Sequence, residues 1–82
     1  MAATEKIRDH MDVICSCGAR LGTVDHVEGD AIKLTRNDPE AGGRHHWIPL
    51  EWVDHVDHQV HLNRNSMDAE RDWEEEVVPL GA

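Results

Sequence analysis

The chain has 82 residues, with 8 Lys and Arg against 17 Asp and Glu, and a formal net charge of −9. This length allows one domain, and so acidic a surface repels nucleic-acid phosphates and anionic membranes. No apolar run reaches the roughly 18 residues of a membrane span, no signal peptide precedes the patterned region, and two cysteines are too few for a secreted disulfide scaffold. We therefore expect a cytoplasmic protein that binds neither nucleic acid nor membrane.

The chain divides into three parts. Residues 1–6 form a polar lead-in, residues 7–62 carry the pattern of one small domain, and residues 63–82 hold an acidic helix and tail. A unit of about 60 residues buries only about 60% of the surface of its unfolded chain. Its core is therefore marginal, which favours association with a second copy or with another protein.

Two strands are predicted before the first hairpin. Residues 12–16 form the first, with Val13 and Cys15 on one face and Ile14 on the other, and residues 21–28 form the second after a tight turn. Gly22 lies inside the second strand, where glycine typically indicates a bulge or a close backbone approach. Residues 29–30, Gly-Asp, are a two-residue hairpin signal.

The next region alternates strand and loop signals. Residues 32–35 form a third predicted strand with one polar face. Residues 36–44, RNDPEAGGR, predict an exposed loop. A fourth strand is expected at residues 46–50, and Pro49 marks an edge or a strand end because proline cannot donate to a ladder.

The remaining elements are short. Residues 50–57 predict a turn or a single helical turn that packs its apolar side chains on the core, with Trp52 buried. Residues 60–62 predict a last strand. Ser66 is the expected cap of a C-terminal helix. Ala69, Trp73 and Val77 form its apolar stripe. The helix should fray at residues 74–76, where the helix dipole disfavours glutamates.

Four segments within residues 7–62 carry a family resemblance: IRDHMDV, GTVDHVEGDAIKLTR, HHWIPLEWV and VHL. They resemble a bacterial family of unknown function related to the PRC-barrel, a domain named after the H subunit of the photosynthetic reaction centre. The resemblance implies a mostly β fold: a small, PRC-barrel-like bent sheet or barrel of about five to six short strands, here with a C-terminal helix. PRC-barrels serve as docking modules and are not known as catalytic domains, so the resemblance implies an interaction role without naming a partner.

Cys15, Cys17, His45 and His46 are candidate metal ligands, because zinc accepts thiolates and imidazoles in a tetrahedral site. The one-residue gap between the cysteines is not a usual zinc spacing. Neighbouring histidines on a strand point to opposite faces, so at most one of them joins such a site. We prefer the interpretation that Cys15 is a small buried side chain and Cys17 a turn residue. No cofactor is then expected, and a zinc site is the alternative.

Trp47 and Ile48 face opposite sides of one predicted strand. Because Ile48 fits the core, Trp47 is the candidate for exposure, and Trp47, Pro49 and Trp73 form the predicted interface. The alternative is that the C-terminal helix covers Trp47 through Trp73. Neither interpretation needs catalytic residues.

No enzyme is expected, since the chain shows no phosphate loop and no nucleophile or acid–base pair with a distinctive spacing. We predict a non-catalytic protein-interaction or adaptor module that forms a homodimer or binds another protein. The alternatives are a Cys/His zinc protein and a small accessory subunit of a larger complex, such as a photosynthetic reaction centre.

Overall fold

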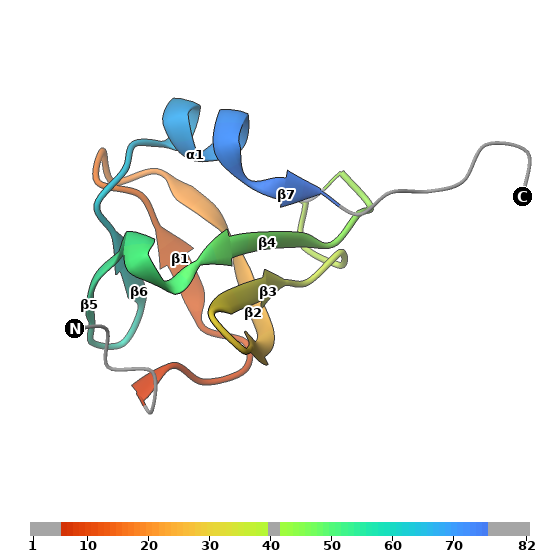
Figure 1. Cartoon of the computed structure of the whole chain (residues 1–82), viewed down its shortest axis with the longest axis horizontal. Helices are drawn as coiled ribbons and strands as arrows, with labels where there is room; N and C mark the ends of the chain where they lie inside the picture. The colour runs from red at the N-terminus through yellow and green to blue at the C-terminus, as the bar shows by residue number, and fades with distance from the viewer. Residues whose placement is uncertain (1–5, 40–41, 76–82) are drawn as a thin grey trace, which may run out of the picture.

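The computed structural model describes residues 6–39 and 42–75 (Figure 1). Its elements, in chain order, are β1 (Asp12–Ile14), β2 (Arg20–Glu28), β3 (Ala31–Leu34), β4 (His46–Pro49), the 3-10 helix η3 (Leu50–Trp52), β5 (Val53–Val56), β6 (Val60–Leu62), α1 (Ser66–Asp72) and β7 (Glu74–Glu75). The mostly β fold with one C-terminal helix is confirmed. The five predicted strands are present, whereas β5 and β7 were not predicted.

The seven strands form one sheet in the order β5-β6-β1-β2-β3-β4-β7. Within the described residues β5 and β7 are its two edges, so the sheet is not closed into a barrel; of the two expected forms, bent sheet or barrel, the bent sheet is the one present. The sheet bends instead. The first half of β2 pairs with β1, and its second half pairs with β3.

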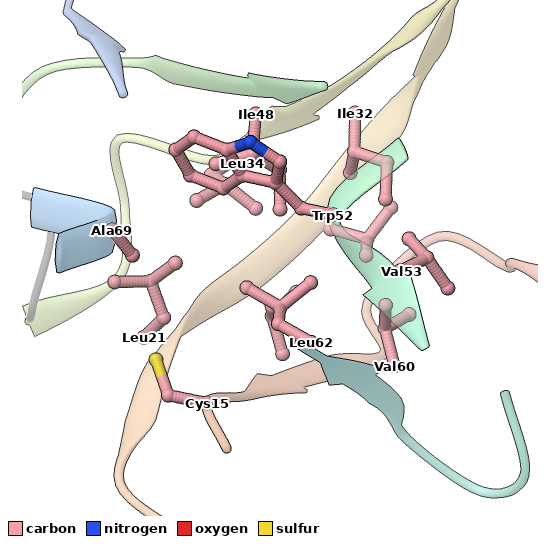
Figure 2. Close-up of a cluster of buried hydrophobic side chains, with 12 residues drawn as sticks. Cys15, Leu21, Ile32, Leu34, Ile48, Trp52, Val53, Val60, Leu62 and Ala69 are labelled. Atoms are coloured by element: carbon pink, nitrogen blue, oxygen red, sulfur yellow. The ribbon is translucent and has the colours of Figure 1, made fainter. Parts of the chain in front are cut away.

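Alternation along the strands builds the core. Val13 and Cys15 point inward on either side of Ile14, and Ile48 is fully buried on β4. Trp52 is 4% exposed, which confirms that it belongs to the core. Figure 2 shows these buried side chains gathered from both halves of the sheet and from α1: Cys15, Leu21, Ile32, Leu34, Ile48, Trp52, Val53, Val60, Leu62 and Ala69.

Gly22 has the predicted role. The β1–β2 register shifts between Val13 and Ile14, where Val13 pairs with Gly22 and Ile14 with Arg20. A Cβ at position 22 would lie 3.3 Å from Cδ1 of Leu34. The strand therefore carries both the bulge and the close approach for which glycine is suited.

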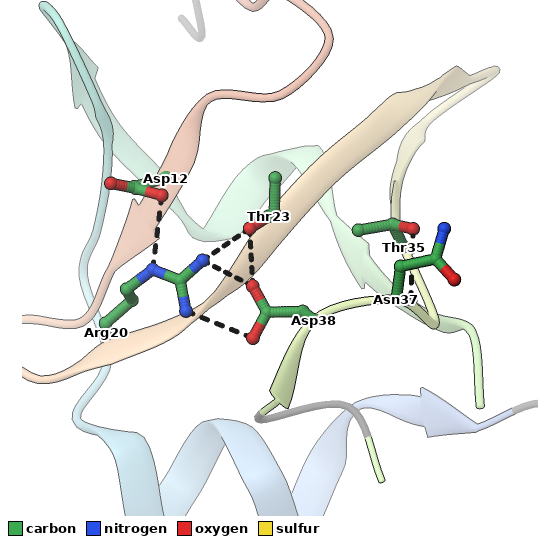
Figure 3. A network of polar contacts seen from close by, with 6 residues as sticks. All are labelled: Asp12, Arg20, Thr23, Thr35, Asn37 and Asp38. Atoms are coloured by element: carbon green, nitrogen blue, oxygen red, sulfur yellow. Dashed lines mark hydrogen bonds and ion pairs between the residues drawn. The ribbon is translucent and has the colours of Figure 1, made fainter. Parts of the chain in front are cut away.

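The loop after β3 is anchored rather than wholly exposed. The Asp38 side chain is 1% exposed and lies against Arg20 and Thr23 of β2 (Figure 3). Nη1 of Arg20 donates to Oδ1 of Asp38 at 3.0 Å, while Nε of Arg20 donates to Asp12 at 3.1 Å. The loop prediction is thus wrong at Asp38, because a bidentate arginine compensates for burying the carboxylate.

The C-terminal helix begins at Ser66, but its cap is Asn65, whose side chain accepts the N–H of Asp68 at 2.8 Å. Ala69 is buried against the sheet, as the predicted stripe requires. The helix ends at Asp72, earlier than predicted. The third residue of the stripe, Val77, lies outside the described residues.

Candidate functional site

A surface hollow of about 430 Å³ lies at the end of β4. It is lined by Ala31, Trp47 and Pro49, here called the floor, and by three acidic residues, Asp30, Asp72 and Glu74, here called the rim; fully buried Ile48 also borders it. These residues come from the β2–β3 turn, from two neighbouring strands and from the C-terminal segment. The fold therefore gathers them from three separate parts of the sequence.

Strand pairing explains why the hollow lies there. β7 pairs with β4 only at His46 and Trp47, so the sheet edge beyond Trp47 has no neighbouring strand among the described residues. Leu50 N–H donates to the Asp30 carbonyl at 2.8 Å, on the β3 side. By the alternation of an antiparallel ladder, the Pro49 carbonyl faces the opposite side. Since Pro49 has no N–H, the edge offers an acceptor there but no donor.

Trp47 is partly buried, and its ring is held in place. Its Nε1 donates to Glu28 at 3.4 Å, and Nζ of Lys33 lies 5.7 Å from the ring centroid. Hydrogen bonds from His26 and from Trp47, with Lys33 nearby, lower the pKa of the Glu28 carboxyl, the contribution of His26 being the largest. A held aromatic ring at a hollow loses little conformational freedom when a partner contacts it.

Trp73 lies elsewhere than predicted. Its ring stacks on that of buried His46, with centroids 3.8 Å apart, and it does not line the hollow. The predicted interface is therefore only partly brought together: Trp47 and Pro49 share the hollow, while Trp73 packs towards the core. Its sequence neighbours Asp72 and Glu74 supply the rim instead.

The contacts of His46 also hold β7 in place. Nε2 of His46 lies 3.1 Å from Oε2 of Glu75, and Arg44 donates to the same carboxylate at 3.2 Å. The hydrogen bond with His46, followed by the charge of Arg44, lowers the pKa of Glu75. These contacts fix the segment that carries Glu74 beside the hollow.

The rim is acidic. Asp30, Asp72 and Glu74 surround an apolar floor in a chain whose net charge is −9. Asp72 has a cationic neighbour, Arg71, whose Nε lies 3.5 Å from its carboxylate. The combination of apolar floor and acidic rim favours a ligand that carries an apolar group beside a positive charge.

The two candidate thiols differ in environment. Cys15 is 3% exposed, and burial, together with the neighbouring Cys17, raises its pKa to about 11. Cys17 is exposed in the turn, with Sγ 3.8 Å from Oγ of Ser66, and backbone hydrogen bonds at Ala19 and Ser66 lower its pKa. The preferred interpretation, a buried Cys15 and a turn residue Cys17, agrees with this arrangement. Burial disfavours the charged thiolate that binds a metal, so Cys15 is poorly suited to be a ligand.

His45 and His46 point to opposite faces of the sheet, as the spacing predicts. His45 is partly exposed, with Nε2 3.6 Å from Asp25, whereas His46 is buried. Within the described residues, the group of three potential metal ligands that the structure gathers contains neither candidate cysteine and neither of these histidines. That group lies on the β5–β6 hairpin, which the sequence pattern did not predict as paired strands.

Together, these features define a small domain whose described residues form one bent sheet and one α-helix, with an apolar hollow and acidic rim at a sheet edge. The chain belongs to the bacterial family described as "Uncharacterized protein conserved in bacteria (DUF2171)", whose model matches residues 7–70. Membership in a bacterial family of unknown function is therefore confirmed. Among curated proteins, none matches the chain. In the part of the chain that the structure describes, no helix has the length and apolarity needed to span a membrane.

Proposed function

We propose that this chain is a non-catalytic protein-interaction domain that binds a partner through the hollow at the end of β4. The observation that carries the proposal is the apolar floor around Trp47 and Pro49, beside a sheet edge that has no neighbouring strand in the described part of the chain. Aromatic side chains at such positions dominate the energetics of protein interfaces. At this edge only the Pro49 carbonyl is available as an acceptor. It can orient a partner but allows little backbone pairing, so recognition depends on side chains.

The acidic rim selects the chemistry of the partner. An extended segment with one Lys or Arg beside an aliphatic side chain places its charge near Asp72 and Glu74 and its apolar group on the floor. The net charge of −9 also attracts basic partners at a distance. Salt should therefore weaken binding, because the rim charges are exposed to solvent.

Self-association is the other form of the same proposal. The small core favours a homodimer, whereas a two-fold interface through the hollow would bring identical carboxylates together. The proposed relationship to the PRC-barrel, a docking module, supports an interaction role in either form. The cytoplasmic location stays a prediction.

Two measurements test the proposal. Sedimentation equilibrium at tens of micromolar, at low and high salt, reports self-association. An array of short synthetic peptides reports recognition of a basic segment. Each peptide pairs Lys or Arg with aliphatic residues, and the control peptides carry Asp or Glu in place of the basic residue. Both are repeated with Trp47→Ala and Asp72→Lys, and with Met67→Ala as the control, because Met67 is 80% exposed on α1 and does not line the hollow.

The proposal predicts binding of basic peptides or formation of a dimer, weakened about tenfold or more by Trp47→Ala, which corresponds to about 1.4 kcal/mol. Met67→Ala should bind as the unmodified chain does. A monomer that binds no peptide would contradict the proposal, as would binding that Trp47→Ala and Met67→Ala reduce equally.

A further inference from the structure

The β5–β6 hairpin brings together three potential metal ligands, His55, Asp57 and His61. One ligand atom from each lies within 4.8 Å of the other two. His55 and His61 are directly paired across the strands, and their rings stack with centroids 4.3 Å apart at an angle of 9°. Asp57 follows β5 in the turn, and its Oδ1 lies 2.9 Å from Nε2 of His61.

A bulge aims His55 at His61. Val53 pairs with Leu62 and His55 pairs with His61, so Asp54 is an extra residue on β5. In a regular strand, His55 would lie on the same face as Val53, two residues earlier, which is buried. The bulge interrupts this alternation, so that His55 lies on the outer face beside His61.

The turn fixes the third ligand. Gln59 N–H donates to Oδ1 of Asp57 at 2.8 Å, and Asp57 N–H donates to the Gln59 carbonyl at 3.0 Å. These two bonds hold the carboxylate on the same side of the hairpin as the imidazoles. The group is therefore arranged by backbone pairing and not only by the chance approach of exposed side chains.

We propose that His55, Asp57 and His61 form a binding site for a divalent transition metal ion such as zinc. Two imidazoles and one carboxylate are the donors that zinc accepts, whereas magnesium and calcium prefer oxygen ligands alone. A metal ion bound between the three side chains takes the place of the hydrogen bond between His61 and Asp57. Each side chain coordinates it through a lone pair.

Three protein ligands leave a coordination position open. The rings of His55 and His61 also border a hollow of about 490 Å³, which Asp54 and Asn63 line as well. The open position can hold water or a donor from another molecule there, as in zinc sites with three protein ligands. Cys15 borders the same hollow, but its burial keeps the thiol protonated and outside the proposed ligand set.

The test is a titration of the untagged full-length chain with zinc chloride at neutral pH, followed by calorimetry. A Cys17→Ser background removes the exposed thiol as a competing ligand. Ligand variants are His55→Gln, Asp57→Asn and His61→Gln. The matched control is His58→Gln, an exposed histidine of the same hairpin outside the group.

The proposal predicts one zinc ion per chain. Loss of an outer-shell partner already costs about 10- to 100-fold in metal affinity, so each ligand variant should bind at least about tenfold more weakly, while His58→Gln binds as the background does. Equal losses in the control and in the ligand variants would overturn the proposal, and so would the absence of saturable binding. Should a ligand variant fail to fold, the imidazole resonances of the background chain decide: zinc must shift those of His55 and His61 and leave those of His58 in place.

Discussion

The buried carboxylate of Asp38 is expected to be a major source of stability for the long loop after β3. Its side chain is 1% exposed, and it accepts hydrogen bonds from Arg20 and from Oγ1 of Thr23. The perturbation is Asp38→Ala, which removes the acceptor from both donors. The loss has two parts, one from Thr23 and one from Arg20.

The Thr23 donor contributes the larger part. A hydrogen bond to a charged group is worth about 1.5 to 3 kcal/mol, and Thr23 is partly buried. The Arg20 side chain is 37% exposed and regains water when Asp38 is removed, so its ion pair is discounted towards the roughly 0.2 to 1 kcal/mol of exposed pairs. Together these give a loss of about 2 to 4 kcal/mol in the free energy of unfolding.

Urea unfolding, followed by tryptophan fluorescence and circular dichroism, measures this loss. With a slope of about 1 kcal/mol/M for a domain this small, the midpoint should fall by about 2 to 4 M. The matched control is Asp12→Ala, whose carboxylate contacts the same Arg20 at 3.1 Å but is 44% exposed, and it should cost less than about 1 kcal/mol. A midpoint shift for Asp38→Ala no larger than that for Asp12→Ala would contradict this prediction.

Three further predictions concern the core, the thiols and β7. Ile48→Ala should lower the free energy of unfolding by about 2 to 5 kcal/mol, since the side chain is fully buried, and Ile48→Val by about 0.5 to 1.5 kcal/mol, both measured in urea. Iodoacetamide should alkylate Cys17 in the folded chain and Cys15 only after unfolding, because burial raises the pKa of Cys15 to about 11 and backbone hydrogen bonds lower that of Cys17; equal rates in a mass spectrum would contradict this. Glu75 has a pKa lowered chiefly by its hydrogen bond with His46, so its stabilisation is present above the ordinary pKa of 4.5 and is lost as the pH falls through the lowered value. Glu75→Gln should therefore flatten the acid side of the stability–pH curve, and an unchanged curve would contradict the assignment.

Period-two alternation made the central strands predictable. Val13 and Cys15, and likewise Ile32 and Leu34, repeat every second residue and are buried in the structure. Each pattern reports on one face of one strand, which local sequence specifies directly. The turn at residues 29–30 and the bulge near Gly22 follow from similarly local rules.

The unpredicted strands depend on distant contacts or on a broken period. In β5 the extra residue Asp54 lets Val53 and Val56 both face inward at a spacing of three, which resembles a helical pattern. In β7 the two glutamates carry no apolar alternation, and their pairing relies on His46 and Arg44, about thirty residues earlier. Neither signal is visible in a short window of sequence.

The part of the candidate site that lies on one strand was predictable, and the part that depends on distant segments was not. Trp47 and Pro49 lie on one strand, and strand-edge reasoning selected both. Asp30, Asp72 and Glu74 come from other segments and join the hollow only through the fold, so no local pattern marks them. The histidines of the β5–β6 hairpin were missed for the related reason that their strand pairing was not predicted.

The most direct test of the interaction role is amide chemical-shift mapping of the ¹⁵N-labelled chain, titrated with the basic peptide that binds most tightly in the array. We predict that the shifted amides cluster at residues 30–31, 47–48 and 72–74, around the hollow. Trp47→Ala should remove these shifts while the rest of the spectrum remains that of the folded chain. Shifts spread evenly over the domain, or concentrated away from the end of β4, would contradict it.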